Sequence, residues 1–205
     1  MVEFTLSLMF LVPLLLGTLV FGFRLIRNLE MEQIVRDLCH MYIQGVDFRN
    51  TGPQQSAALL ASGYDLSGTG TSVIILSKIR LVDQTDCDAG NPLKTPGTSC
   101  PNLNNPAFIE QVIVGNTSLQ INGVNVAKSA FGTPPLDSSQ TVSAADMANT
   151  STAAAGNTAG STGFVKVLVL KAGEYGYVTE MFNATPGLNI VGLTGAPQIY
   201  ARSVF

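Results

Sequence analysis

The sequence has few charged residues, a single histidine and no run of lysine or arginine. Charged residues make up 12% of the 205 residues, about half of the usual share, so Ser, Thr, Asn, Gln and Gly must cover most of the surface. The formal net charge of -3 and the lack of a basic cluster argue against a nucleic-acid partner, because phosphate binding needs clustered Lys and Arg. A surface of this kind suits an extracellular or assembled protein.

The scarcity of metal ligands and nucleophile–base pairs argues against catalysis. One histidine, His40, is too few for most zinc sites and catalytic triads. Asp83, Asp86 and Asp88 crowd one loop without the spacing of an EF-hand, so we expect a solvated loop, with a calcium site as the alternative. The glycines of 67–72 lack the Lys of a phosphate loop. The sequence therefore predicts no enzymatic activity, no metal and no cofactor.

Cysteine is also scarce, with three residues in the chain. Cys87 and Cys100 lie in the turn-rich segment DCDAGNPLKTPGTSC, where we expect a disulfide rather than two free thiols, because so polar a loop rarely buries cysteine for packing. Such a bridge contributes ~3 kcal/mol in the chain-entropy model and implies an oxidising compartment. Cys39 lies in a helical pattern and is expected to face a neighbour as a small apolar residue, with intermolecular pairing as the alternative.

One long apolar run stands at the start of the chain. From Phe4 to Phe23 there are 20 residues without a charge, which as a helix span ~30 Å, the thickness of a bilayer core. Pro13 predicts a kink or a loosened turn within it. The run is longer than the apolar part of a signal peptide, lacks a basic leader and is followed by no small-residue cleavage site, so we expect it to be retained.

The charges around this run give conflicting orientations. Arg24, Arg27 and Arg36 all follow it and nothing basic precedes it, which by the positive-inside rule places the C-terminal part in the cytoplasm. The expected disulfide and the charge-poor surface predict the opposite. The two agree if a short basic leader preceded Met1 and was removed after insertion. We therefore expect a processed chain; the alternative is that Met1 is the initiator.

The helix is predicted to continue beyond the apolar run. Apolar residues recur with helical spacing among charged ones, at Leu25, Leu29, Ile34, Leu38, Met41 and Tyr42. Gly45 is the first plausible stop. We expect one helix from Met1 to about Gly45, ~65 Å long, whose amphipathic half packs on a head domain.

The remainder of the chain predicts a β-rich head. A short helical pattern at 53–66 begins with Pro53. Five strands are predicted, at 72–82, 108–115, 164–170, 175–182 and 198–205, the third and fourth joined as a hairpin by KAGE. This order predicts an α+β fold in which the long N-terminal helix covers one face of an antiparallel sheet. The expected division is an N-terminal helix over 1–48 and a head over 49–205.

Residues 132–163 differ in composition from the rest of the head. The segment has no aromatic residue and only two charges, Asp137 and Asp146, and cannot bury enough to pack alone. We expect a long surface loop; the alternatives are a contact arm ordered by neighbouring subunits and a glycosylated patch. Asn-x-Ser/Thr triplets, which also arise by chance in such a chain, give three candidate glycosylation sites, Asn116, Asn149 and Asn183.

The start of the chain resembles the type IV pilin superfamily, and most closely its tight-adherence (TadE-like) pseudopilins. Val2-Glu3-Phe4-Thr5-Leu6 is similar to the Val-Glu-Phe-Ala-Leu start of that branch, and Phe21-Gly22-Phe23-Arg24 is similar to its Phe-Gly-Arg end. The closing PQIYARSVF also resembles its last strand. The resemblance covers roughly residues 1–48. Glu3 lies nearer to the start of the chain than the corresponding acid usually does.

This resemblance implies a structural subunit that inserts in the inner membrane. With the help of an assembly machinery, it would polymerise through its N-terminal helix into an extracellular filament. Glu3 of the same or a neighbouring subunit would neutralise the buried amine of Met1; the alternative is that Glu3 lies at the headgroup level. Small residues would let the helices approach closely. The expected packing positions are Phe4, Pro13, Gly17, Thr18 and Gly22.

Two other functions fit the same sequence. One is a monomeric, membrane-anchored binding module or adhesin, in which Glu3 is incidental and the helix never leaves the bilayer. The other is a minor subunit that primes or caps a filament of another protein. The state of the N-terminus discriminates between an anchor and a filament subunit, because an anchor has no need of a free amine beside an acid.

Overall fold

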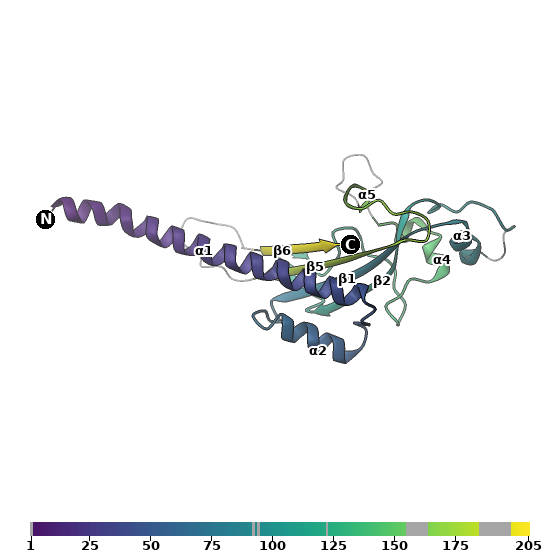
Figure 1. Ribbon diagram of the computed structural model, residues 1–205, viewed down its shortest axis with the longest axis horizontal. Helices are drawn as coiled ribbons and strands as arrows, with labels where there is room; N and C mark the ends of the chain where they lie inside the picture. Colours follow the sequence, from purple (N-terminus) through teal and green to yellow (C-terminus); the bar gives the residue numbers. More distant parts are fainter. Residues whose placement is uncertain (1, 92, 94, 122, 155–163, 185–197) are drawn as a thin grey trace.

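The chain forms a long N-terminal helix and a head built around a four-stranded antiparallel sheet, as the computed structural model shows (Figure 1). The structure describes residues 2–91, 93, 95–121, 123–154, 164–184 and 198–205. Its helices are α1 (Val2–Ile43), α2 (Thr51–Leu60), α3 (Gln84–Gly90), α4 (Ala144–Met147) and α5 (Phe164–Val167), with a 3-10 turn η1 (Thr150–Thr152). Its strands are β1 (Ser72–Leu81), β2 (Pro106–Gly115), β3 (Gln120–Ile121), β4 (Val124–Asn125), β5 (Tyr175–Ala184) and β6 (Gln198–Val204). The predicted α+β class is confirmed.

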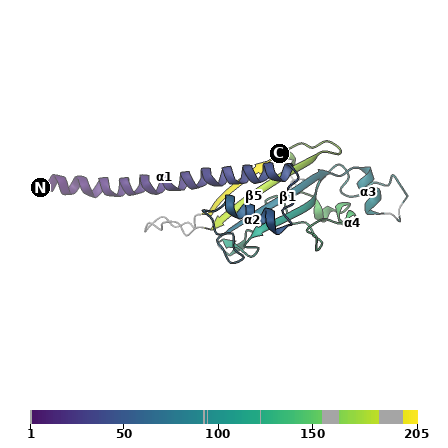
Figure 2. The ribbon, with the colours of Figure 1, turned by 60° about the horizontal axis from the view of Figure 1, so that its bottom comes forward.

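Helix α1 ends close to the predicted stop. Gly45 has a φ of +87°, its N–H donates to the carbonyl of Tyr42 at 3.1 Å, and the N–H of Val46 donates to the carbonyl of Met41 at 3.1 Å. This is a Schellman motif, and glycine adopts its left-handed conformation without a Cβ clash. The kink predicted at Pro13 is not seen: α1 runs through this residue and stays straight in both views (Figures 1 and 2). Pro13 thus removes a backbone hydrogen bond without changing the helix direction.

The main sheet has the strand order β2-β1-β5-β6, with every neighbouring pair antiparallel. The central strand β1 is buried on both faces, which explains why residues 72–82 form an apolar run with little alternation. The strands predicted at 108–115, 175–182 and 198–205 correspond to β2, β5 and β6. The short hairpin of β3 and β4 was not predicted.

One face of the sheet is covered by the C-terminal half of α1 together with α2 (Figure 2). Helix α1 packs along β5 and β6, and its fully buried side chains begin at Met31. The core on this face is formed by side chains of α1, of α2 and its C-terminal end, and of the sheet. It includes Val35, Leu38, Tyr42, Ala57, Ala61, Ile74, Leu76, Val112 and Met181. The hydroxyl of Tyr64 donates to the carbonyl of Arg27 at 2.8 Å, so the head holds α1 from this residue onward.

The strand predicted at 164–170, and with it the KAGE hairpin, is wrong. Both positions beside β5 are occupied, by β1 and β6, and Phe164–Val167 form α5 instead. The ring of Phe164 packs edge to face on Phe131 at 5.4 Å, on the sheet face opposite α1. It lies so close to β5 that a Cβ at Gly176 would be 2.7 Å from it. Phe164, Leu168 and Leu170 therefore pack on the second face of the sheet.

The segment predicted as a long surface loop packs against the head over its described part, 132–154. Isolated bridges join Thr141 to Glu110 and Ala153 to Ala107, so the segment covers the outer edge of β2. Buried side chains occur along it, at Val142, Ala148, Thr152 and Ala154. Over these residues the segment is a largely irregular surface connection that packs on the head, and contact with neighbouring subunits stays a prediction. Residues 155–163 lie outside the described residues.

The predicted disulfide is present and joins α3 to the loop that leads into β2. Cys87 and Cys100 are bonded, with their Cα atoms 5.4 Å apart. Cys39 is a free thiol, fully buried against β5, where it donates to the carbonyl of Tyr177 at 3.8 Å. Its predicted role as a small packed residue is confirmed, and the folded head leaves this thiol inaccessible to a second chain.

Replacing both Cys87 and Cys100 by Ala should lower the free energy of unfolding by about 3 kcal/mol, because the bridge closes a loop with a sequence separation of 13. Urea unfolding of the purified chain measures the change. The wild type under reducing conditions is the control and should unfold with the variant. A variant as stable as the oxidised wild type would contradict the expectation.

Candidate functional site

The N-terminal part of α1, residues 7–26, projects from the head (Figures 1 and 2). Its apolar side chains are exposed on every side, for example Met9 at 73%, Phe10 at 70% and Phe21 at 70%. A helix that is apolar all round needs lipid or other protein around it. By length and hydropathy, α1 is the one helix among the described residues that could cross a membrane. This projecting surface is the candidate functional site.

The apolar surface ends where the head begins. Arg24 and Arg27 are exposed at the end of the uncharged run. The carbonyl of Arg27 already accepts the hydroxyl of Tyr64, and Met31 is fully buried one turn further on. Whatever covers the apolar helix therefore reaches almost to the head. The second half of α1 is fixed in the head core, so helix and head form one continuous unit.

Two of the predicted packing residues form a shallow groove on the projecting helix. Thr18 and Gly22 lie in it, flanked by Leu19, Phe23 and Ile26, and its volume is about 230 Å³. A Cβ at Gly22 would have no atom within 4 Å. The Thr18 hydroxyl donates to the carbonyl of Leu15 at 2.8 Å, which satisfies it within the helix. The groove can therefore accept an apolar side chain without leaving a polar group unpaired.

The remaining predicted assembly residues are not brought into this groove. Pro13 and Gly17 lie on α1 but do not line it. Met1 lies outside the described residues. For Glu3 and Phe4 the structure describes the backbone, which is helical and lies at the end of α1 farthest from the head (Figure 1).

The three aspartates of the disulfide loop serve α3 and do not converge on one point. Asp83 is the N-cap: its carboxylate accepts the N–H of Asp86 at 3.0 Å, and the carboxylate of Asp86 accepts the N–H of Asp83 at 3.1 Å. This is a capping box. Both carboxylates also pair with Arg80, at 3.1 and 3.3 Å. Within the described residues, no group of three possible ligands is placed to hold a metal ion.

The capping contacts predict an acid-sensitive contribution to stability. The Thr85 hydroxyl, then the Asp86 N–H and the nearby Arg80, hold the pKa of Asp83 at about 2, below its ordinary 3.8. Because the folded pKa is depressed, the stabilisation is present above the ordinary pKa and is lost as the pH falls from about 4 through about 2. Asp83→Asn should therefore be less stable than the wild type near neutral pH, with the gap closing over this interval. Urea midpoints across the pH range measure the gap, and a constant gap would contradict the prediction.

The fold distinguishes among the three candidate glycosylation sites. The Asn116 amide donates to the carbonyl of Gly70 at 2.8 Å, and the Asn183 amide is buried and donates to the hydroxyl of Ser72 at 3.0 Å. A sugar on either nitrogen would break its hydrogen bond. Because Asn183 is also buried, the folded head leaves this side chain inaccessible to glycosylation. The side chain of Asn149 is exposed.

His40 is also exposed, with its ring 4.8 Å from that of Phe205, and has a packing role at the surface.

Comparisons with protein-family models, with curated proteins and with solved structures gave no match. The relationship to type IV pilins therefore stays a prediction from the residues.

Proposed function

We propose that this protein is a pilin-like structural subunit, inserted in the inner membrane by α1 and then assembled through α1 into an extracellular filament. The observation that carries the proposal is the division of α1: residues 7–23 are apolar and exposed all round, while the half from Met31 onward is buried in the head. In the monomer, lipid would cover the exposed half. In the filament, the same half of neighbouring copies would replace lipid.

The head supports an extracellular destination. A disulfide persists in an oxidising compartment, and the Cys87–Cys100 bridge lies in the head. The head is also poor in charge, as suits a surface that contacts other copies. The partners of this subunit are then the membrane before assembly, the assembly machinery and further copies of the chain. The proposed role is structural, with no catalytic step.

A monomeric membrane-anchored module is the second candidate, because a single apolar helix that ends at the head would also serve as an anchor. The groove of Thr18 and Gly22 favours assembly over anchoring. Small residues at a helix surface let another backbone approach closely, whereas fluid lipid chains have no need of such a groove.

The groove gives a graded test of this distinction. Gly22→Leu fills it and should reduce filament yield sharply without affecting membrane insertion, whereas Gly22→Ala should retain much of the yield, because a methyl group meets no atom within 4 Å. Filament yield and membrane content are measured in the same cells. Equal yields from the Leu variant and the wild type would remove the argument from the groove.

The decisive experiment is electron microscopy of material sheared from the cells, with mass spectrometry of its main protein. Thin filaments composed mainly of this chain support the proposal. If the protein remains in the membrane fraction and no filament contains it, the anchored module becomes the better interpretation. If the chain is a trace component of filaments of another protein, it is a minor subunit.

A further inference from the structure

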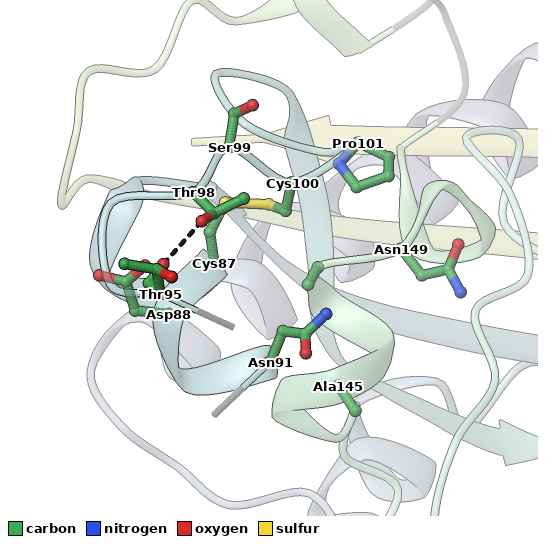
Figure 3. Close-up of a pocket in the computed structure, with 12 residues that line it drawn as sticks. Cys87, Asp88, Asn91, Thr95, Thr98, Ser99, Cys100, Pro101, Ala145 and Asn149 are labelled. Atoms are coloured by element: carbon green, nitrogen blue, oxygen red, sulfur yellow. Dashed lines mark hydrogen bonds between the residues drawn. A yellow bond between two sulfur atoms is a disulfide. The ribbon is translucent and has the colours of Figure 1, made fainter. Parts of the chain in front are cut away.

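A cavity of mixed polar and apolar lining is found at the end of the head opposite the N-terminus, where α3, the disulfide loop and α4 meet (Figures 1 and 3). Its volume is about 230 Å³. The cavity is remote from the apolar half of α1, and the proposed function does not use it. It would remain accessible while α1 is held in a membrane, because it lies at the other end of the molecule.

The walls of this cavity are fixed to one another. The Cys87–Cys100 bridge joins α3 to the loop. The backbones of α3 and α4 touch at Gly90, where a Cβ would lie 2.5 Å from the carbonyl oxygen of Ala144. The buried amide of Asn102 donates to the carbonyl of Asn149 at 2.7 Å and so holds the segment after α4. The cavity is therefore part of the packed structure.

The loop side of the cavity is held by Asp88. Its Oδ1 accepts the N–H of Gly97 and the side-chain amide of Gln84, both at 3.0 Å. The Gln84 amide also donates to the carbonyl of Thr98 at 3.0 Å. Both bonds to the carboxylate are made by Oδ1. Among the described residues no hydrogen bond to Oδ2 occurs, and this oxygen can accept a hydrogen bond from a ligand.

Neutral hydrogen-bonding side chains share the lining with apolar surface, arranged around the cavity as Figure 3 shows. They are the amides of Asn91 and Asn149 and the hydroxyls of Thr95, Thr98 and Ser99. The Thr98 hydroxyl donates to the carbonyl of Thr95 at 2.7 Å, which leaves its oxygen as an acceptor. Ala145, Ala148 and Pro101 add small apolar surfaces between them. The lining therefore offers both donors and acceptors, interleaved with C–H surface.

From this lining we propose that the cavity binds one neutral, polyhydroxylated unit, such as a single sugar ring. Sugar hydroxyls both donate and accept, and so match amides, hydroxyls and one carboxylate. The carboxylate of Asp88 disfavours anions, and a hard cation wants several carboxylates where the described lining has one. The volume lies below the ~300–1,000 Å³ of sites for drug-sized ligands, which suits one ring. The sugar could be free or at the end of a surface polysaccharide.

Saturation-transfer NMR on the full-length chain in a zwitterionic, sugar-free detergent tests the proposal. The probes are a panel of neutral monosaccharides, a neutral polysaccharide and, as chemical controls, sugar phosphates. We expect weak binding of neutral sugars, with a dissociation constant of about 1 mM, because one ring makes few contacts. Ala145→Phe fills the cavity from an exposed position on α4 and should abolish the signal. Ala58→Phe, on the exposed side of α2, is the matched control and should leave it unchanged.

A second variant keeps the test valid if Ala145→Phe disturbs the head. Asn91→Ala removes one hydrogen-bonding side chain and should weaken binding about tenfold. Signals from free monosaccharides show that a free sugar binds to the cavity. Signals from the polysaccharide alone show that the bound sugar must be part of a polysaccharide. Both results support the site. No signal from any neutral sugar, an unchanged signal in Ala145→Phe, or a signal from the sugar phosphates alone would overturn it. None of these results depends on filament formation, which is measured separately.

Discussion

Replacing Glu3 by Ala or Gln should stop or sharply slow filament assembly while leaving the head folded. The helical backbone of α1 carries Glu3 at the end farthest from the head, so the change lies far from the core. In the proposed filament this end is surrounded by other helices, and the amine of Met1 needs a charge partner there. Breaking a buried pair by removing one partner costs about 3–5 kcal/mol, enough to decide whether each subunit adds. Filament yield in sheared material, counted by electron microscopy, measures the effect.

The control for this prediction is another carboxylate on the same helix. Glu32 is exposed on the half of α1 that lies against the head, and Glu32→Gln should assemble normally. Retention of the Cys87–Cys100 disulfide and of protease resistance in both variants shows that the head is folded. Normal filaments from cells that make only Glu3→Ala would refute the buried-pair account, and the position of Glu3 would then reflect only the membrane surface.

Local chemistry was sufficient to predict the parts of the fold that depend on nearby residues. Gly45 was expected to end the first helix, and it does so through a Schellman motif made with Met41 and Tyr42. The same holds for the strands rich in β-branched residues and for the bridge between Cys87 and Cys100, which are 13 residues apart in the chain.

The errors occur where distant parts of the chain compete for one place. The segment that begins at Phe164 is rich in β-branched residues, but β1 and β6 already flank β5, and the ring of Phe164 packs on Phe131 instead. In the segment 132–154, which has no aromatic residue, the place on the head comes from bridges to the edge of β2, which the composition of the segment does not reveal. Periodicity within a segment carries no information on which edges other strands have already taken.

The candidate sites were predictable to different degrees. The apolar half of α1 is visible in the sequence because its surface is one continuous run of residues. Thr18 and Gly22 are two of the five predicted packing positions and lie four residues apart, on one side of the helix. The sequence does not single out Leu19, Phe23 and Ile26, which complete the groove. The cavity between α3 and α4 was not predicted, because these two helices are far apart in the chain and meet only in the folded head.

Two truncations should separate the two halves of α1. A chain that lacks residues 1–24 should be soluble and monomeric without detergent and nearly as stable as the intact head, because it keeps the carbonyl of Arg27 for Tyr64 and all buried residues from Met31 onward. A chain that lacks residues 1–43 should fail to fold. It loses four large buried side chains, those of Met31, Val35, Leu38 and Tyr42. Each contributes about 1.5–3 kcal/mol, and together they match the ~5–15 kcal/mol that holds a whole domain.

Circular dichroism and urea unfolding of the two truncations measure this difference. A matched pair of point variants in the chain that lacks residues 1–24 tests the contribution of single side chains of α1. Leu38 is fully buried, so Leu38→Ala should cost about 2–5 kcal/mol, whereas Leu29 is 50% exposed and Leu29→Ala should change little. A stable fold without residues 1–43 would show that α1 is only attached to the head. The expected result makes α1 part of the head core, so a force or a neighbouring helix acting on its apolar half acts directly on the head.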